Sequence, residues 1–276
     1  MDAPVHTPGT AAAVHHRRTP GALRVLSWHL AAYRRLWKVN VLASFGQPLL
    51  YLLGLGVGVG ALVDKNTGSS EVLGSSSYVA FVVPGLLVTT AMALAAGESM
   101  WPVMGGLKWH RGYHGIAATP LEARDIVLGH GAWMAVRCGL ATGAVAVVLA
   151  VFPDTRSWGL APSVLVSMLV GVSFAMPIMA FSVGSEYDGA FAGIQRFVII
   201  PLFLFGGAFY PLSQLPAAVQ WVAKVAPLWH GVVVARGFTS GNVDWTGVAG
   251  HLSFVALWAV AGTAITIRRL RGKLYP

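Results

Sequence analysis

The chain has 276 residues, of which 55% are hydrophobic and only 11% charged, and its mean hydropathy is +0.66. Apolar runs fill about half of the length, which excludes a soluble catalytic domain of ordinary size. The formal net charge of +9 would suggest a nucleic-acid partner for a soluble protein, but in a membrane protein it sets orientation, so no nucleic-acid partner is expected.

Six long apolar runs predict six transmembrane helices, because a bilayer core about 30 Å thick is crossed by roughly 20 mostly apolar residues. The runs are 40–63, 79–101, 122–151, 163–185, 194–210 and 248–267. The predicted fold is therefore an all-α membrane protein in which residues 21–276 form one transmembrane domain. Residues 1–20 are polar and rich in Pro and His, which predicts a disordered cytoplasmic tail.

Positive charge is concentrated on one side of the six runs. That side holds Arg17, Arg18, Arg24, Arg34, Arg35, Lys38, Lys108, Arg111, Arg124, Arg196, Arg268, Arg269, Arg271 and Lys273. The other side holds Lys65, Arg156, Lys224 and Arg236. Because cytoplasmic loops carry an excess of Lys and Arg, we expect a multi-pass plasma-membrane protein with both termini in the cytoplasm.

Residues 21–38, ahead of the first run, predict an amphipathic helix. Its apolar face is formed by residues that recur at helical spacing, namely Leu23, Leu26, Leu30, Tyr33 and Trp37. Its basic residues fall off that face. Such a helix with aromatic anchors is typical of the membrane interface and is attracted to anionic lipid, with a soluble packing helix or a calmodulin-like target as the alternatives.

Four glycines follow in the first run: Gly54, Gly56, Gly58 and Gly60. They form two GxxxG pairs, which predict close packing between helices. A nucleotide-binding loop is disfavoured because no GxGxxG follows a strand.

Residues 101–125, between the second and third runs, are too polar to cross a membrane and too aromatic for a plain linker. The candidate contact residues there are Lys108, Trp109, His110, Arg111 and Tyr113. Thr119 and Glu122 flank Pro120 in a capping-box pattern, which predicts that the third helix starts at Pro120. His110 and His114 have the i,i+4 spacing of metal ligands, but no other ligands complete a set, so no metal site is expected.

Three ionisable residues lie in or beside the runs: Glu98, Arg137 and Glu186. A charge at the bilayer centre costs roughly 2.5–3.5 kcal/mol, so Arg137, about 25 Å into its helix, is a functional candidate. Glu98 and Glu186 lie near the cytoplasmic ends of their runs and are not expected to partner it. Arg137 either faces a polar cavity or lipid phosphate, or extends to the outer interface. Glu98 and Arg137 are the candidates for a translocation path, with an interfacial cap as the other interpretation of Glu98.

The segment after the fifth run carries an ordered series of motif residues: Gly206, Gly207, Pro211, Leu215, Pro216, Pro227, Leu228, His230 and Arg236. This series resembles the C-terminal signature of ABC-2 type permeases, the membrane subunits of one class of ABC exporters. Thr119-Pro120-Leu121 and residues 125–129 resemble the nodulation-protein-J branch, associated with lipo-oligosaccharide export, and its drug-exporter relatives. The Pro-rich but apolar stretch 211–229 independently predicts two short re-entrant helices, with an extracellular amphipathic loop as the alternative.

The resemblance implies a permease dimer, of identical or paralogous chains, with two copies of a separate ABC ATP-binding subunit. It implies a coupling helix within 101–113 and a connecting helix at 21–38, through Leu26, Leu30, Tyr33, Arg34 and Trp37. The chain contains no GxxxxGK[ST], so ATP and Mg are expected on the partner subunit and no cofactor or enzymatic activity on this chain. The implied cargo is an amphiphile (a lipid, glycolipid, lipo-oligosaccharide or hydrophobic drug) that moves outward from the inner leaflet or cytoplasm among the membrane lipids.

Two other functions compete with this interpretation. An ATPase-independent carrier or channel would carry midplane acids or broken helices in inverted repeats, and no repeat between the halves is evident. An intramembrane enzyme acting on lipids would need His, Asp or Glu clustered at one depth, whereas the 9 histidines are scattered along the chain.

Overall fold

The computed structural model describes residues 20–65, 73 and 77–275, and the regular structure in these residues is entirely helical. The helices are α1 (Gly21–Tyr51), α2 (Gly60–Val63), α4 (Tyr78–Met104), α5 (Gly112–Ala117), α6 (Ala123–Val151), α7 (Leu160–Gly184), α8 (Gly189–Ile194), α9 (Ile200–Phe205), α10 (Ala217–Val225), α11 (Pro227–Ser240) and α12 (Trp245–Leu274). Short π-helical stretches join some of them, at Leu52–Val59, Gly105–Trp109 and Gln195–Ile199, and a 3₁₀ turn forms at Leu212–Gln214. The predicted tail, 1–20, lies outside the described residues except for its last residue.

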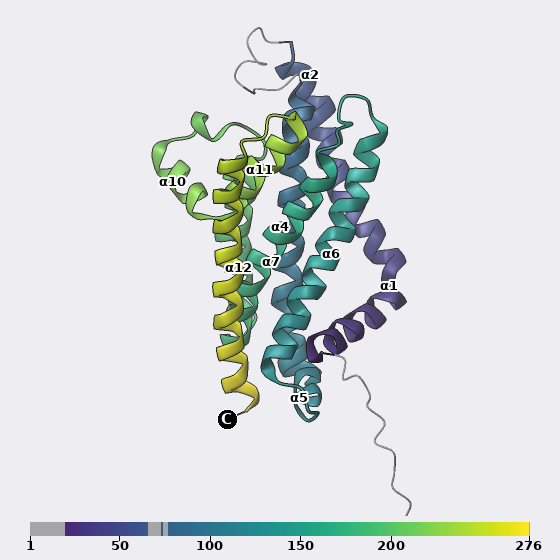
Figure 1. Ribbon diagram of the computed structural model, residues 1–276, viewed down its shortest axis with the longest axis vertical. Helices are drawn as coiled ribbons and strands as arrows, with labels where there is room; N and C mark the ends of the chain where they lie inside the picture. The colour runs from purple at the N-terminus through teal and green to yellow at the C-terminus, as the bar shows by residue number, and fades with distance from the viewer. Residues whose placement is uncertain (1–19, 66–72, 74–76, 276) are drawn as a thin grey trace, which may run out of the picture.

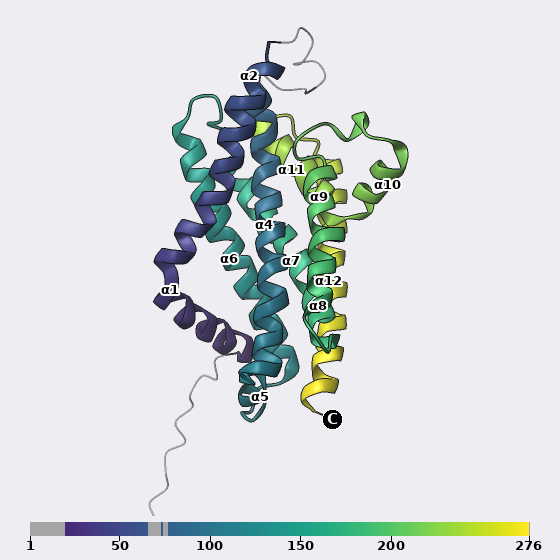
Figure 2. The same cartoon turned by 180° about the vertical axis from the view of Figure 1, so that it is seen from behind.

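Helix α7 lies in the middle of the bundle, where it contacts α4, α6, α11 and α12 (Figure 1). Its inward side chains, such as Val170 and Met179, are fully buried, whereas outward apolar side chains such as Val147 and Leu257 on its neighbours are exposed. Seen from behind, α8 and α9 lie in front of α12 (Figure 2). An apolar exterior around a packed core is what a bilayer environment requires of a helix bundle.

Four helices are long and apolar enough to cross a membrane: Tyr78–Trp109, which is α4 with its π-helical continuation, and α6, α7 and α12. They correspond to the predicted spans 79–101, 122–151, 163–185 and 248–267. A fifth is added only if α10 and α11, which meet at an angle of 86°, count as one broken span. The predicted span 194–210 forms the shorter apolar helix Gly189–Phe205, because the chain turns at the two glycines that follow.

The predicted amphipathic helix and the start of the predicted first span form one helix, α1. Both views show α1 leaving the bundle end that carries α5 at a slant and then turning toward α2 (Figure 1, Figure 2). Leu26, Leu30 and Tyr33 pack against the core around α6, while Leu23 and Trp37 are exposed. The amphipathic face thus packs partly on protein. The predicted span 40–63 is not among the candidate spans, and most side chains from 39 to 49 lie outside the described residues.

Helix α6 begins at Ala123, three residues after the predicted start at Pro120. Glu122 is the N-cap, and its backbone N–H donates to Asp125 Oδ2 at 3.1 Å, so the capping box pairs Glu122 with Asp125. The Thr119 hydroxyl instead donates to the Ile116 carbonyl oxygen at 2.6 Å, at the end of α5. The prediction was wrong because two overlapping capping patterns occur three residues apart, and the second suits the helix dipole equally well.

Close glycine contacts set the distance between helices at some places and not at others. A Cβ atom at Gly262 of α12 would lie 2.5 Å from the Pro177 ring of α7, so these helices touch at the backbone. At Gly54 and Gly58 nothing lies within 4 Å of such an atom. These two glycines therefore make no close contact with the described part of their own chain, and the predicted helix packing at this pair stays a prediction.

Replacing Gly262 with Ala is expected to force α7 and α12 apart and to lower stability by about 1–3 kcal/mol, because the added methyl group overlaps Pro177. Gly250→Ala in the same helix is the control, since its added Cβ meets nothing within 4 Å. The measurement is the thermal unfolding midpoint of the purified protein in one detergent. Equal shifts for the two variants would contradict the close contact.

Candidate functional site

Gly206 and Gly207 end α9 for two different physical reasons. A Cβ atom at Gly206 would lie 2.4 Å from a Leu228 methyl group and 2.5 Å from the Leu202 carbonyl oxygen. Gly207 has φ of 83°, a left-handed conformation that favours glycine. The first glycine therefore permits close packing of α11, and the second permits the turn itself.

Arg236 of α11 holds this turn in place. Its Nη2 donates to the Gly207 carbonyl oxygen at 2.9 Å and to the carbonyl oxygens of Phe81 and Ala208 at 3.4 Å. Its guanidinium carbon lies 3.7 Å from the centroid of the Phe81 ring. Arg236 thus supplies hydrogen bonds where the chain is not helical, and it joins α11 to α4 and the glycine turn.

The remaining motif residues shape the bent pair of helices after the turn. Pro211 precedes the 3₁₀ turn, Pro216 is the N-cap of α10, and Pro227 is the first residue of α11. The Leu215 carbonyl oxygen accepts a hydrogen bond from the Gln220 side chain at 2.9 Å. Helix α11 packs against α4, α7 and α12, so this part of the segment is not a free loop.

His230 joins three helices at one point. Its Nδ1 lies 2.7 Å from Nδ1 of His251 on α12, and its Nε2 lies 2.8 Å from the Lys224 carbonyl oxygen at the end of α10. The Phe254 ring stacks on the His230 ring, with 4.1 Å between the centroids. The motif histidine is therefore placed to fix the bend between α10 and α11.

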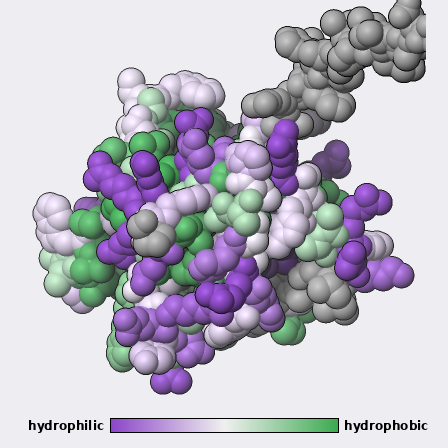
Figure 3. Space-filling view, turned by 90° about the horizontal axis from the view of Figure 1, so that it is seen from below, coloured by the Kyte–Doolittle hydropathy of each residue, from purple (hydrophilic) through white to green (hydrophobic). Residues whose placement is uncertain are grey.

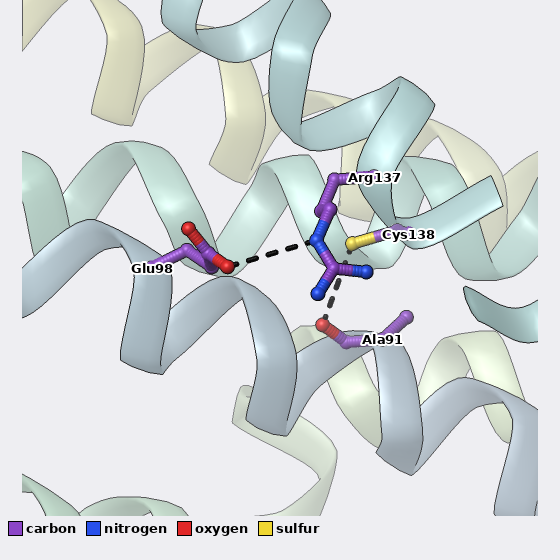
Figure 4. A network of polar contacts seen from close by, with 4 residues as sticks. All are labelled: Ala91, Glu98, Arg137 and Cys138. Atoms are coloured by element: carbon purple, nitrogen blue, oxygen red, sulfur yellow. Dashed lines mark hydrogen bonds and ion pairs between the residues drawn. The ribbon is translucent and has the colours of Figure 1, made fainter. Parts of the chain in front are cut away.

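Arg137 on α6 forms an ion pair with Glu98 on α4, with 3.6 Å between Nε and Oε1 (Figure 4). The Arg137 side chain is only 4% exposed and that of Glu98 is 30% exposed, so Arg137 does not extend to an interface. The expectation that Glu98 could not partner Arg137 was wrong because the helix of α4 continues to Trp109. Glu98 consequently lies about 17 Å along the helix from Trp109. Arg137 lies about 21 Å along α6 from Ala123, so the two residues are at similar depths in the bundle.

An aromatic cluster connects this ion pair to the first part of α1. The Tyr33 ring centroid lies 5.2 Å from the Arg137 guanidinium carbon and 5.3 Å from the Trp133 ring. His29 stacks on Trp133 at 5.7 Å and lies 5.5 Å from His130. Burial lowers the pKa of His29 to about 4, so its ring is neutral near pH 7.

Sequence reasoning missed His130, which lies in the predicted span 122–151. Its Nε2 is 3.4 Å from the Ser99 hydroxyl oxygen, while the Ser99 carbonyl oxygen accepts a hydrogen bond from the Ser182 hydroxyl at 2.8 Å. The signal was available, because an ionisable residue inside a span is a functional candidate by the rule applied to Arg137.

Cys138, beside Arg137, is fully buried where α4, α6 and α7 meet (Figure 4). Its thiol donates to the Ala91 carbonyl oxygen at 3.6 Å. A Cβ atom at Gly171 of α7 would lie 2.5 Å from its sulfur, so the glycine makes room for the thiol. The ion pair thus lies beside a tightly packed three-helix contact.

The predicted contact residues between the second and third runs lie at the α5 end of the bundle, where hydrophilic side chains gather (Figure 3). Lys108, Trp109, His110 and Arg111 are exposed, Trp109 by 56%. Arg111 has φ of 51° and turns the chain between the π-helical stretch and α5. Tyr113 differs from this set, because it is only 2% exposed, packs beside Gly106, and has its pKa raised by burial.

An apolar pocket of about 650 Å³ lies between α7, α9, α10, α11 and α12. Its wall includes the side chains of Phe174, Phe197, Phe205, Val222 and Trp258. Among the described residues that line it, none is charged. Such a pocket suits a hydrocarbon chain better than a polar solute.

Within residues 20–65, 73 and 77–275, no group of three or more His, Cys, Asp or Glu is arranged to hold a metal ion.

Comparison with known proteins gives a consistent family match. Residues 23–238 match the ABC-2 type transporter family. Nodulation protein J of Rhizobium leguminosarum bv. trifolii is 32% identical, covering 90% of this chain and 94% of the relative. Nodulation protein J of Rhizobium meliloti (strain 1021) is also 32% identical, over 92% of this chain and 97% of the relative.

A more distant relative is the inner membrane transport permease YadH of Escherichia coli (strain K12), 25% identical over 76% of this chain and 77% of the relative. No solved structure gives a significant match. The matches therefore cover most of the chain, including the motif segment from Gly206 to Arg236.

Removing either charge of the buried pair is expected to cost about 3–5 kcal/mol of stability, because Glu98→Gln or Arg137→Gln abolishes the ion pair while one of its charges stays in a water-poor site. The double variant is expected to be less destabilised than the two single effects added together. Thermal unfolding of the three variants in detergent measures this coupling. Glu186→Gln, at an exposed position, is the control. Additive effects would mean that the two charges do not interact.

Arg236→Lys is expected to lower stability by about 1–3 kcal/mol although it keeps the charge, because an ammonium cannot reproduce the planar guanidinium's contacts with the glycine turn and the Phe81 ring. Arg156→Lys, at an exposed position, should change stability by no more than about 0.5 kcal/mol. Unfolding midpoints compare the two variants. If Arg236→Lys left the unfolding midpoint unchanged while Arg236→Met lowered it, the positive charge alone, and not the guanidinium geometry, would account for the stabilisation.

Proposed function

The chain belongs to the ABC-2 type transporter family, and on that basis we propose that it is the permease subunit of an ATP-driven exporter. The observation that carries this proposal is the family match over residues 23–238. Family membership makes the chain a membrane-embedded transport component of an ABC transporter rather than a catalytic subunit.

The proposed complex contains two permease chains, identical or paralogous, and two copies of a separate ATP-binding subunit that binds ATP and Mg. The lack of a GxxxxGK[ST] motif in this chain supports a separate ATPase. The surface around Gly54 and Gly58 is open, and the neighbouring side chains of Leu50 and Leu53 are exposed. Small residues beside exposed leucines suit close contact with a helix of a second permease chain.

We propose six membrane spans in the plasma membrane, with the α5 end and both termini on the cytoplasmic side. Basic residues of the α5 end, such as Lys108, Arg124 and Lys273, support this orientation. The fifth span would be Gly189–Phe205, whose 17 helical residues extend about 25 Å, close to the thickness of a bilayer core. The bent pair α10 and α11 would then enter from the outer leaflet without crossing.

The first part of α1 is the proposed connecting helix at the cytoplasmic interface. Leu26, Leu30 and Tyr33 attach it to the core around α6, and Arg34 and Trp37 are exposed. Exposed basic and aromatic side chains next to the bilayer favour contact with anionic lipid. Through Tyr33, a shift of this helix would reach the Arg137–Glu98 pair directly.

The segment from Gly105 to Ala117, a π-helical stretch followed by α5, is the proposed coupling element that docks on the ATP-binding subunit. Trp109 and His110 are exposed there, and the left-handed backbone of Arg111 defines the turn. Tyr113 would support this turn from the interior of the protein, because its ring is buried and does not face a partner. ATP-driven closure of the partner subunits would then move this segment and α1. The movement would shift the permease between its inward-facing and outward-facing states.

The proposed cargo is an amphiphile, and the apolar pocket beneath α10 supports this chemical class. Its uncharged lining can take the hydrocarbon part of a lipid, glycolipid, lipo-oligosaccharide or hydrophobic drug, and a polar headgroup would stay at the rim. The similarity to nodulation protein J supports a lipo-oligosaccharide among these candidates.

The test is to express the chain with its candidate ATP-binding subunit and to measure co-purification and ATP hydrolysis in lipid vesicles. The variant Trp109→Ala/His110→Ala is expected to lower the permease-dependent ATPase rate at least tenfold, because the exposed coupling contacts are lost while the fold is kept. Tyr113 is left unchanged, because truncating a buried ring would disturb the fold itself.

Trp158→Ala is the matched control, since Trp158 is exposed on the loop between α6 and α7 at the opposite end of the bundle. It should leave the ATPase rate unchanged. Failure of the wild-type chain to associate with any ATP-binding subunit would overturn the exporter proposal and favour an ATPase-independent carrier or channel.

A further inference from the structure

A second pocket, of about 440 Å³, lies at the α5 end of the bundle and has a basic lining. It is lined by Leu107, Lys108, Arg111, His114 and Lys273. These residues come from three segments that are distant in sequence: the π-helical stretch with the turn that follows it, α5, and the last turn of α12. None of the lining residues is acidic, so the pocket concentrates positive charge.

The positive charge of this pocket is not neutralised by neighbouring carboxylates. Within the described parts of the chain, none of Lys108, Arg111 and Lys273 forms an ion pair with Asp or Glu. The Lys108 ammonium donates to the backbone carbonyl oxygen of Glu186, which leaves its charge unpaired. The Nδ1 atom of His114 is buried and has no hydrogen-bond partner. Buried or converging polar groups without partners are costly unless a ligand satisfies them.

The walls of the pocket are held together by contacts outside it. Leu270 and Leu274 of α12 pack in the same core as Tyr113 and Leu107. The Tyr275 hydroxyl donates to the Leu121 carbonyl oxygen at 2.7 Å, which attaches the end of α12 to the chain just before α6. The basic side chains are therefore carried on a packed junction, so little ordering is needed when an anion binds.

We propose that this pocket binds a phosphate group, supplied either by the headgroup of an anionic phospholipid or by free phosphate. Arg111 offers a planar fork of donors, Lys108 and Lys273 supply point charges, and the imidazole of His114 supplies a further hydrogen bond. A phosphate held there would connect the segment Gly105–Ala117 to α12. The site goes beyond the proposed transport function, because it concerns anion binding by this chain alone.

The test uses the full-length chain without an ATP-binding subunit, so that its outcome is independent of the exporter proposal. Thermal unfolding is followed in nanodiscs of phosphatidylcholine with increasing phosphatidylglycerol, and separately in detergent with increasing inorganic phosphate. The pocket variant is Arg111→Asn/Lys273→Gln, in which Asn tolerates the left-handed backbone. The control is Arg268→Gln/Arg271→Gln, which removes two exposed charges of α12 outside the pocket.

We expect the wild-type chain and the control to be stabilised with the same concentration dependence, and the pocket variant to respond with an affinity at least about tenfold weaker. A response to inorganic phosphate identifies a free-phosphate site, and a response to phosphatidylglycerol alone identifies a headgroup site. Equal losses in both double variants would mean diffuse charge attraction and would overturn the proposal. No response of the wild-type chain to either ligand would also overturn it.

Discussion

Inside a bilayer every backbone N–H and carbonyl needs a hydrogen-bond partner from the protein, and this constraint governs the part of the chain where the helices stop. Between Phe205 and Ala217 the backbone has no continuous helix to satisfy it. Arg236 reaches back from α11 and donates to the carbonyl oxygens of the glycine turn. The bend between α10 and α11, the contact between His230 and His251, and the apolar pocket beneath α10 all lie around the turn that this arginine holds.

A second buried arginine organises the other half of the bundle. Arg137 pairs with Glu98 across α6 and α4, and Tyr33 of α1 lies against its guanidinium group. A buried ion pair contributes little net stability, but it penalises any arrangement that separates its members. Helices α1, α4 and α6 are therefore held together at one depth of the bundle. A movement of α1 that displaced Tyr33 would change the surroundings of the buried charge, which is a direct route from α1 to the core.

The sequence contained local signals that predict local structure well. Hydropathy located α4, α6, α7 and α12, and the proline and glycine pattern anticipated a bent pair of short helices. Depth was harder to predict, because a helix continues past the end of its apolar run, as α4 does through Gly105–Trp109. The helix start after Thr119 was ambiguous, since two capping patterns overlap there. The burial of Tyr113 and the contact between His29 and His130 depend on tertiary packing, which a single sequence does not encode locally.

The burial of Cys138 has a practical consequence for studies of topology. Its thiol is fully enclosed between α4, α6 and α7 and is hydrogen-bonded to a backbone carbonyl oxygen. It is also the only cysteine in the chain. Maleimide reagents dissolved in water have no access to a thiol in such a place while the protein is folded. Single cysteines introduced at loops and termini can therefore be labelled in the otherwise unaltered protein, without the cysteine-free background that such mapping normally requires.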